Sequence, residues 1–310
     1  MGIDPSAVLA LTAALAFALY TVVVEKGLTA VDDAGDASPA LAAAFYFTVV
    51  ACVVFWALAG ARGLNWSAFS LETVWPFVIA GVAYPALFRF LYYESIDRVG
   101  AAVSSAIMGA YPAVSALAAV AALGEVLPSA AGIGIALIVG GVGLLQLTQT
   151  TDDGAGRDVV RQKLAAASPL DFLFPVCTML LTGSAFVLIK FGLDSWPGDP
   201  VTATALTQTP ALVIFGAWAL TPAGRRQLRV PRAALYAFLA ASACNIVGWL
   251  GQFYALNLGT VVTVVPLLNT IPLLVLAFSY IAARQLPRSP RVIGAVLAII
   301  VGVTLVRVPV

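Results

Sequence analysis

Arg89 is a charged residue inside an otherwise apolar stretch, YPALFRFLYYES at residues 84–95. A guanidinium stays protonated at physiological pH and presents a planar fork of donors that suits a carboxylate or a phosphate. Tyr92 and Tyr93 follow at helical spacing and can extend an amphipathic wall. Arg89 is therefore the leading candidate for substrate contact. Snorkelling to the membrane interface and a structural ion pair are the alternatives.

A second polar group lies in NIVGWLGQFY at residues 245–254. Asn245, Trp249 and Gln252 offer two amides and an aromatic ring, which suits a zwitterionic or aromatic metabolite. The alternative is that the two amides hydrogen-bond neighbouring helices and bind no ligand.

Two prolines are placed to interrupt helices near their middle, Pro112 and Pro272. Each removes a backbone hydrogen bond and leaves a carbonyl available. Ser105 and Met108 precede Pro112, and Asn269 precedes Pro272 by three residues. Matched interruptions of this kind indicate a binding site at the membrane midplane, although proline in membrane helices can also be a simple kink.

The residues for enzyme chemistry are missing from the sequence. It contains no histidine, which excludes Ser-His hydrolysis and histidine-ligated metal, and no pair of buried aspartates is evident. The three cysteines lie in apolar runs and are expected to be small buried hydrophobes. A net charge of +1 gives no basic face for nucleic acid. We expect no catalytic residue, metal or cofactor.

The elements that must position these residues are membrane helices. Hydrophobic residues make up 61% of the 310, charged residues 10%, and the mean hydropathy is +1.00, whereas soluble domains carry about 25% charged residues. Apolar runs long enough to cross a bilayer predict ten spans. They cover approximately 6–24, 39–60, 74–95, 100–123, 129–148, 172–191, 200–220, 233–255, 259–282 and 292–307, with a turn predicted at 257–260.

A polar segment at 150–171 divides the chain into two halves of five spans, 1–149 and 172–310, and is expected to be a surface linker. An offset of 160 residues aligns Pro112 with Pro272, Glu125 with Gln285, and Arg89 with Trp249. Because five is an odd number, the second copy must enter the membrane from the opposite side. The sequence therefore predicts an all-α integral membrane protein of ten transmembrane helices in two inverted-topology five-helix repeats.

The two copies resemble the EamA branch of the drug/metabolite transporter superfamily. The stretches SAIMGAYPAVSALAAVAALGEVLPSAAGIGIALIVGGV and YALNLGTVVTVVPLLNTIPLLVLAFSYIAARQLPRSPRVIGAVLAIIVGV carry a mid-helix proline and a glycine-spaced fifth span. A Gly-Glu pair follows the fourth span of the first copy, but Gln285 replaces the glutamate in the second. Arg89 stands where the resemblance would lead us to expect a small or apolar residue. The resemblance implies a metabolite transporter.

The placement of charged residues predicts which of them lie near one another and how the protein is oriented in the membrane. Glu25 and Glu94 end spans that run in the same direction, so they fall near one membrane face and could pair with Arg89 or serve in coupling, whereas Lys190 falls near the other face. Counted over the loops, twelve Lys and Arg residues lie on the face reached by the first span and two on the face of the termini. The positive-inside rule then predicts extracytoplasmic termini, whereas the resemblance more often suggests cytoplasmic ones.

Small residues at every fourth position mark spans five and ten: Gly132, Ala136 and Gly140, with Gly294, Ala298 and Gly302. Such ridges allow close helix approach, and a homodimer through these spans is one use for them.

The predicted function is transport of small amphipathic metabolites such as amino acids across the cell (plasma) membrane. The mechanism would be alternating access around a central cavity, acting as an exporter or a facilitator. A channel and a non-transporting membrane subunit or sensor are the alternatives. The partners implied are a small-molecule substrate and the lipid bilayer.

Overall fold

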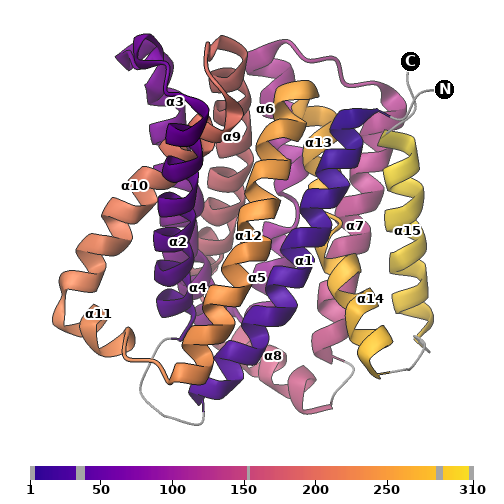
Figure 1. Ribbon diagram of the computed structural model, residues 1–310. Helices are drawn as coiled ribbons and strands as arrows, with labels where there is room; N and C mark the ends of the chain where they lie inside the picture. The colour runs from indigo at the N-terminus through magenta and orange to yellow at the C-terminus, as the bar shows by residue number, and fades with distance from the viewer. Residues whose placement is uncertain (1–3, 33–38, 152–153, 284–288, 307–310) are drawn as a thin grey trace.

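The computed structural model describes residues 4–32, 39–151, 154–283 and 289–306, and these residues form helices without a strand among them (Figure 1). Within this part, nine helical segments are long and apolar enough to cross a membrane, and α15 is a shorter apolar helix. The α-helices are α1 (Pro5–Asp32), α2 (Pro39–Arg62), α3 (Leu71–Gly81), α4 (Phe88–Val99), α5 (Ala101–Met108), α6 (Tyr111–Leu123), α7 (Ser129–Thr151), α8 (Gly154–Ala166), α9 (Leu173–Ser195), α10 (Pro200–Leu220), α11 (Pro222–Gln227), α12 (Arg232–Leu258), α13 (Val261–Leu268), α14 (Ile271–Ala283) and α15 (Pro290–Val306).

The helix ends follow local sequence signals. Asp199 caps α10, where its carboxylate accepts a hydrogen bond from the Val201 amide at 3.2 Å. Gly124 ends α6 in the left-handed region with φ 68°, which glycine adopts without strain. The turn predicted at 257–260 is confirmed, because α12 ends at Leu258 and α13 begins at Val261.

Three of the long segments are interrupted. The predicted third span consists of α3, a π-helical turn η2 (Val82–Leu87) that contains Pro85, and α4. Short breaks separate α5 from α6 at 109–110 and α13 from α14 at 269–270. Pro112 and Pro272 are the second residues of α6 and α14, positions where a helix needs no amide donor. Each proline therefore starts the second half of its broken helix.

The long helices pack side by side in pairs that join the two halves of the chain. Figure 1 shows α1 along α12 and α7 beside α15, and the packing of both pairs is extensive. The helix pair α2 and α10 also packs together, and α9 packs against α3, α4 and α6. Between α7 and α15 the backbones approach closely, so that a Cβ atom added to Gly302 would lie 2.6 Å from the Gly134 carbonyl oxygen.

The predicted surface linker contains α8 and a 3₁₀ turn, η3 (Pro169–Phe172). Lys163 on α8 donates to the carbonyls of Ile96 and Asp97 at 3.0 and 3.1 Å, which satisfies the last turn of α4. Arg98 in the same turn pairs with Glu94 and Asp171, both at 2.8 Å. The linker is thus fastened to the end of α4.

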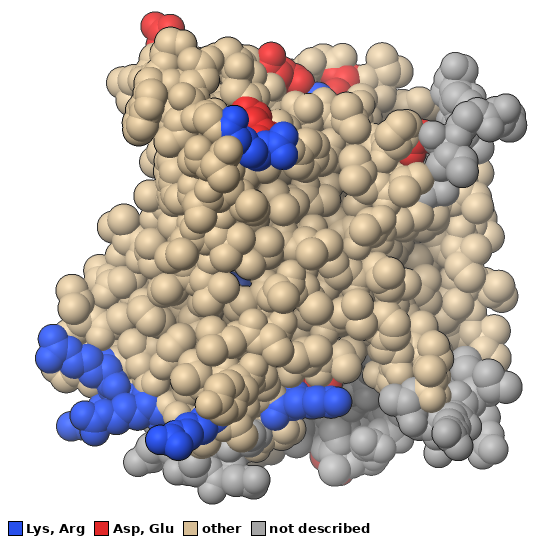
Figure 2. All heavy atoms as spheres, viewed as in Figure 1, with Lys and Arg blue, Asp and Glu red and all other residues tan. Residues whose placement is uncertain are grey.

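Most basic residues gather at one end of the bundle, whereas acidic residues lie at both ends. Figure 2 shows most of the visible Lys and Arg at the lower end of this face, opposite the end where both termini lie in Figure 1. Arg225 and Arg226 lie on α11, and Arg232 starts α12. The charge asymmetry predicted from the loops is therefore present in three dimensions.

Candidate substrate cavity

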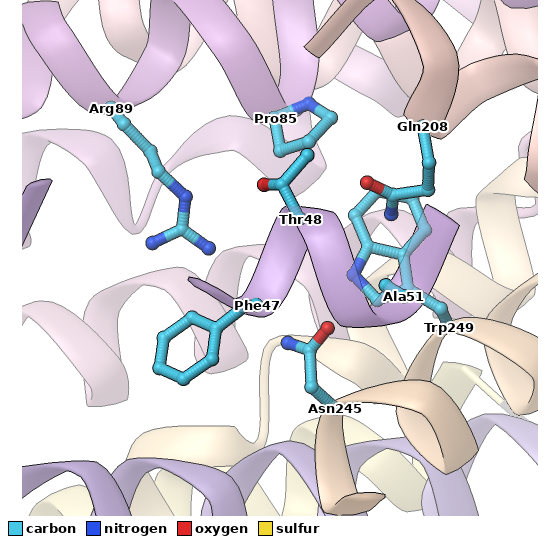
Figure 3. A pocket seen from close by; sticks show the side chains of 8 residues that line it. All are labelled: Phe47, Thr48, Ala51, Pro85, Arg89, Gln208, Asn245 and Trp249. Atoms are coloured by element: carbon cyan, nitrogen blue, oxygen red, sulfur yellow. The ribbon is translucent and has the colours of Figure 1, made fainter. Parts of the chain in front are cut away.

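A small cavity with a volume of about 10 Å³, roughly the space for one water molecule, lies between helices of both halves of the chain. Figure 3 shows its lining: Phe47, Thr48 and Ala51 from α2, Pro85 from η2, Arg89 from α4, Gln208 from α10, and Asn245 and Trp249 from α12. Three of these residues, Arg89, Asn245 and Trp249, were predicted from the sequence, and the structure brings them together.

Arg89 lies deep in its span and faces this interior. Ten residues of helix separate it from Val99 at the end of α4, which corresponds to about 15 Å, or half of a bilayer core of about 30 Å. Its Nε atom is buried and has no hydrogen-bond partner in the described structure. Because the side chain lines an interior cavity, snorkelling to the interface does not describe its position.

Neither predicted ion-pair partner of Arg89, Glu94 or Glu25, pairs with it. Glu94 pairs with Arg98, and Lys190, predicted near the other face, pairs with Asp194 at 2.6 Å. Glu25 is exposed near the end of α1. Within the described residues, Arg89 belongs to no salt bridge. The titratable side chains that interact with its guanidinium are the tyrosines Tyr20, Tyr84 and Tyr93, and none of them is a carboxylate.

Gln208 is a cavity residue that was not among the predicted contacts. It is 2% exposed, and Figure 3 shows its carboxamide directed into the space that the Asn245 carboxamide also faces. Neither the Gln208 nor the Asn245 carboxamide hydrogen-bonds to another described residue. The signal was present, because the offset of 160 that pairs Arg89 with Trp249 also pairs Thr48 with Gln208.

Trp249 closes one side of the cavity. Its ring stacks on Tyr84 with centroids 5.5 Å apart and packs near Phe253 at 6.0 Å. Gln252, one turn further along α12, is 1% exposed and its Nε2 atom has no partner among the described residues. Gln252 is outside the cavity lining, so its role as a substrate contact stays a prediction.

The other predicted contacts bind neighbouring helices in this conformation. The Tyr92 and Ser105 hydroxyls are 2.7 Å apart, which joins α4 to α5. Tyr93 donates to the Ala40 carbonyl at 3.4 Å, and Met108 packs against the hydrophobic core. These four side chains lie outside the cavity lining.

The two helix breaks touch each other. The Asn269 Nδ2 donates to the Gly109 carbonyl oxygen at 2.9 Å, and the bond is buried. The break before α6 frees this carbonyl, and the break before α14 supplies the amide that satisfies it. Residues 109 and 269 are 160 apart in sequence, which is the offset found between the two copies.

The model of the EamA-like transporter family matches residues 5–147 and again residues 169–308. The chain belongs to the EamA-like transporter family. This family is the domain of the drug/metabolite transporter superfamily, and its members are transporters, not enzymes. Together with the nine apolar helices in the described chain, membership indicates a multi-pass integral membrane protein.

A solved structure titled "Crystal structure of protein" is similar in fold to this EamA-family chain. The TM-score is 0.73 at 17% sequence identity, and the match covers 99% of this chain and 97% of the other. At this identity the likeness shows the fold alone. No curated protein matches the chain.

The Gly-Glu pair of this EamA-family chain has a structural role. The two carboxylate oxygens of Glu125 accept hydrogen bonds from the Val261 and Val262 amides at 2.8 and 2.9 Å. These amides belong to the first turn of α13, which has no intrahelical acceptors for them. Glu125 thereby caps a helix of the other half of the chain. Its counterpart Gln285 lies outside the described residues.

A polar cluster joins three helices at the end of the bundle nearest the termini. Arg62 at the end of α2 pairs with Asp199 at the start of α10. Tyr254 on α12 donates to Asp199 at 3.0 Å. The same three helices line the cavity, so the cluster ties them together at this end.

Proposed function

We propose that this protein is a carrier that moves small amphipathic metabolites through the cavity around Arg89. The observation that carries the proposal is a buried guanidinium without a carboxylate partner, in a cavity built by both halves of the chain. An uncompensated charge at membrane depth is costly and usually marks a functional site. Amino acids belong to this substrate class, because a carboxylate could meet Arg89 while an apolar side chain meets Trp249.

Ten spans in two inverted repeats give this carrier its symmetry. We take α15 as the tenth span: its 17 residues make about 26 Å of helix, and a bilayer can thin to meet a short span. The pairs Thr48 and Gln208, and Arg89 and Trp249, place equivalent positions around one cavity. The bond between residues 269 and 109 joins equivalent positions directly, as expected near a two-fold axis.

Alternating access is favoured over a channel by the small size of the cavity. Ligand pockets usually have volumes of about 300 to 1,000 Å³, so a cavity of about 10 Å³ must widen to admit a substrate. The Arg62, Asp199 and Tyr254 cluster holds α2, α10 and α12 together on the side of the termini. Rocking of one repeat against the other would break this cluster and open the cavity.

Facilitated diffusion or exchange fits the described residues better than proton coupling. The lining of the cavity contains no carboxylate. Of the two candidates at the helix ends, Glu94 is engaged by Arg98 and Glu25 is exposed. We place the protein in the cell membrane as an exporter or facilitator, with the basic end of the bundle in the cytoplasm.

A homodimer remains part of the proposal. Gly132, Gly140 and Gly294 have open space where a Cβ atom would lie, whereas Gly302 is used within the chain against α7. The small residues that face outward are therefore free to pack against a second copy.

Counterflow in proteoliposomes tests the proposed function. Vesicles are loaded with an unlabelled mixture of amino acids and 2-hydroxy acids, and the labelled mixture is added outside. Transient accumulation of label above equilibrium is expected of a carrier. Equilibration without accumulation would indicate a channel, and absence of flux from a folded sample would favour a subunit or sensor.

A further inference from the structure

The cavity around Arg89 carries one positive charge and no negative charge. Its lining consists of Arg89, three neutral polar side chains and apolar surface. The described carboxylates that have partners are engaged elsewhere: Asp4 with Ser6, Glu94 and Asp171 with Arg98, Asp194 with Lys190, Asp199 with Arg62, and Glu125 with the first turn of α13. The site is therefore complementary to an anion and offers no charged partner to a cation.

The neutral groups of the site suit a second, uncharged polar group on the ligand. The carboxamides of Gln208 and Asn245 each bring two donors and one acceptor, and both are directed into the cavity in Figure 3. Thr48 already donates to the Ala44 carbonyl at 2.8 Å, which leaves its oxygen as an acceptor. A hydroxyl or oxo group beside a carboxylate can bond to these neutral partners.

The remainder of the cavity lining suits an apolar part of the ligand. Trp249 and Phe47 present ring surface, and Ala51 and Pro85 complete the wall. Aromatic rings of this kind pack well against aliphatic or planar groups.

We propose that, within the substrate class of the proposed function on which this inference rests, the protein selects organic anions that carry no ammonium group. The fitting compounds are 2-hydroxy and 2-oxo acids with an apolar side chain. Their carboxylate meets Arg89, their hydroxyl or oxo group meets Gln208 or Asn245, and their side chain meets Trp249.

The ammonium group of an amino acid is the feature that the site disfavours. It lies one carbon from the carboxylate, so it would be held close to the Arg89 guanidinium when the carboxylate is bound. Like charges repel strongly in a cavity of low dielectric constant, and a neutral amide oxygen does not offset that repulsion. We expect a preference of about tenfold or more for the hydroxy acid over the amino acid with the same side chain.

Paired substrates test this selection. Counterflow of a labelled mixture of 2-hydroxy acids is compared with counterflow of the amino acids that bear the same side chains, at pH 7 and equal concentration. We expect the hydroxy acids to accumulate at least tenfold faster. Equal or faster accumulation of the amino acids would overturn the inference while leaving the carrier intact. Accumulation of neither mixture would overturn both the inference and the proposed function.

A binding measurement separates the charge effect from transport. The hydroxy-acid mixture should raise the unfolding temperature of the purified protein more than the amino acids do. The rise should disappear in Arg89→Gln and persist in Arg98→Gln, which removes the same charge from an exposed position of the same helix. A rise that survives Arg89→Gln would overturn the assignment of the anion to this residue. If Arg89→Gln fails to fold, Arg89→Lys takes its place in the test. This variant keeps the charge and should retain part of the rise in unfolding temperature.

Discussion

Removal of the Glu125 carboxylate should destabilise the protein, because this side chain caps α13 from the other half of the chain. It accepts two backbone hydrogen bonds, from Val261 at 2.8 Å and Val262 at 2.9 Å. Hydrogen bonds to charged groups contribute about 1.5 to 3 kcal/mol each. Glu125 is only partly buried, so water can replace part of the interaction, and the lower value applies. Two bonds then give a loss of about 3 kcal/mol for Glu125→Ala.

Glu125→Gln provides a graded comparison. Glutamine keeps one oxygen acceptor but loses the charge, so about half of the effect, roughly 1.5 kcal/mol, is expected. Glu25→Gln makes the same chemical change at an exposed position and should alter stability by no more than about 0.5 kcal/mol. Reversible unfolding in detergent, followed by loss of helical circular dichroism, gives the three free-energy differences. If Glu125→Ala and Glu25→Gln had the same small effect, the cap would have no energetic role.

Three further experiments probe the helix crossings and the orientation. Asn269→Ala removes the donor to the buried Gly109 carbonyl and should cost about 1 to 3 kcal/mol in the same unfolding assay; an unchanged stability would show that the bond is not needed. Gly302→Val places atoms against the α7 backbone and should cost about 1 to 3 kcal/mol, whereas Gly294→Val has open space and should cost little; equal effects would contradict the packing of α7 and α15. A cysteine at Asn65 should react with an impermeant maleimide on intact cells and one at Arg226 should be protected, because basic loops stay in the cytoplasm; the reverse pattern would invert the orientation.

Apolar run length was sufficient to predict most of the membrane helices. The division of 233–283 into two helices followed from the turn signal at 257–260, and the structure agrees. The tenth predicted span forms the shorter helix α15, which the apolar run alone could not distinguish from a full span. The π-helical turn could not be predicted from the presence of proline alone. Pro85 lies in this turn, whereas Pro76 and Pro210 lie inside the regular helices α3 and α10.

The site was predictable only in part, since composition shows which residues are polar but not which neighbour each one meets. Arg89 was selected because a charge is unusual in an apolar stretch, and Trp249 because the repeat offset of 160 places it opposite Arg89. Gln208 was missed because threonines surround it in TALTQTP, and one more polar residue does not stand out in a stretch that is already polar. Tyr92 was expected to face the substrate, but the tight turn at Gly100, with φ 89°, brings α5 back against α4 and pairs Tyr92 with Ser105.

Counterflow of Arg89→Gln beside the wild type and Arg98→Gln tests the central claim most directly. The claim is that substrate crosses the membrane in contact with the cavity arginine. We predict that the wild type and Arg98→Gln accumulate label to a similar level, whereas folded Arg89→Gln loses at least tenfold in rate, the effect of leaving a substrate charge unpaired. Accumulation by Arg89→Gln at the wild-type rate would contradict the claim and leave Arg89 without a transport role.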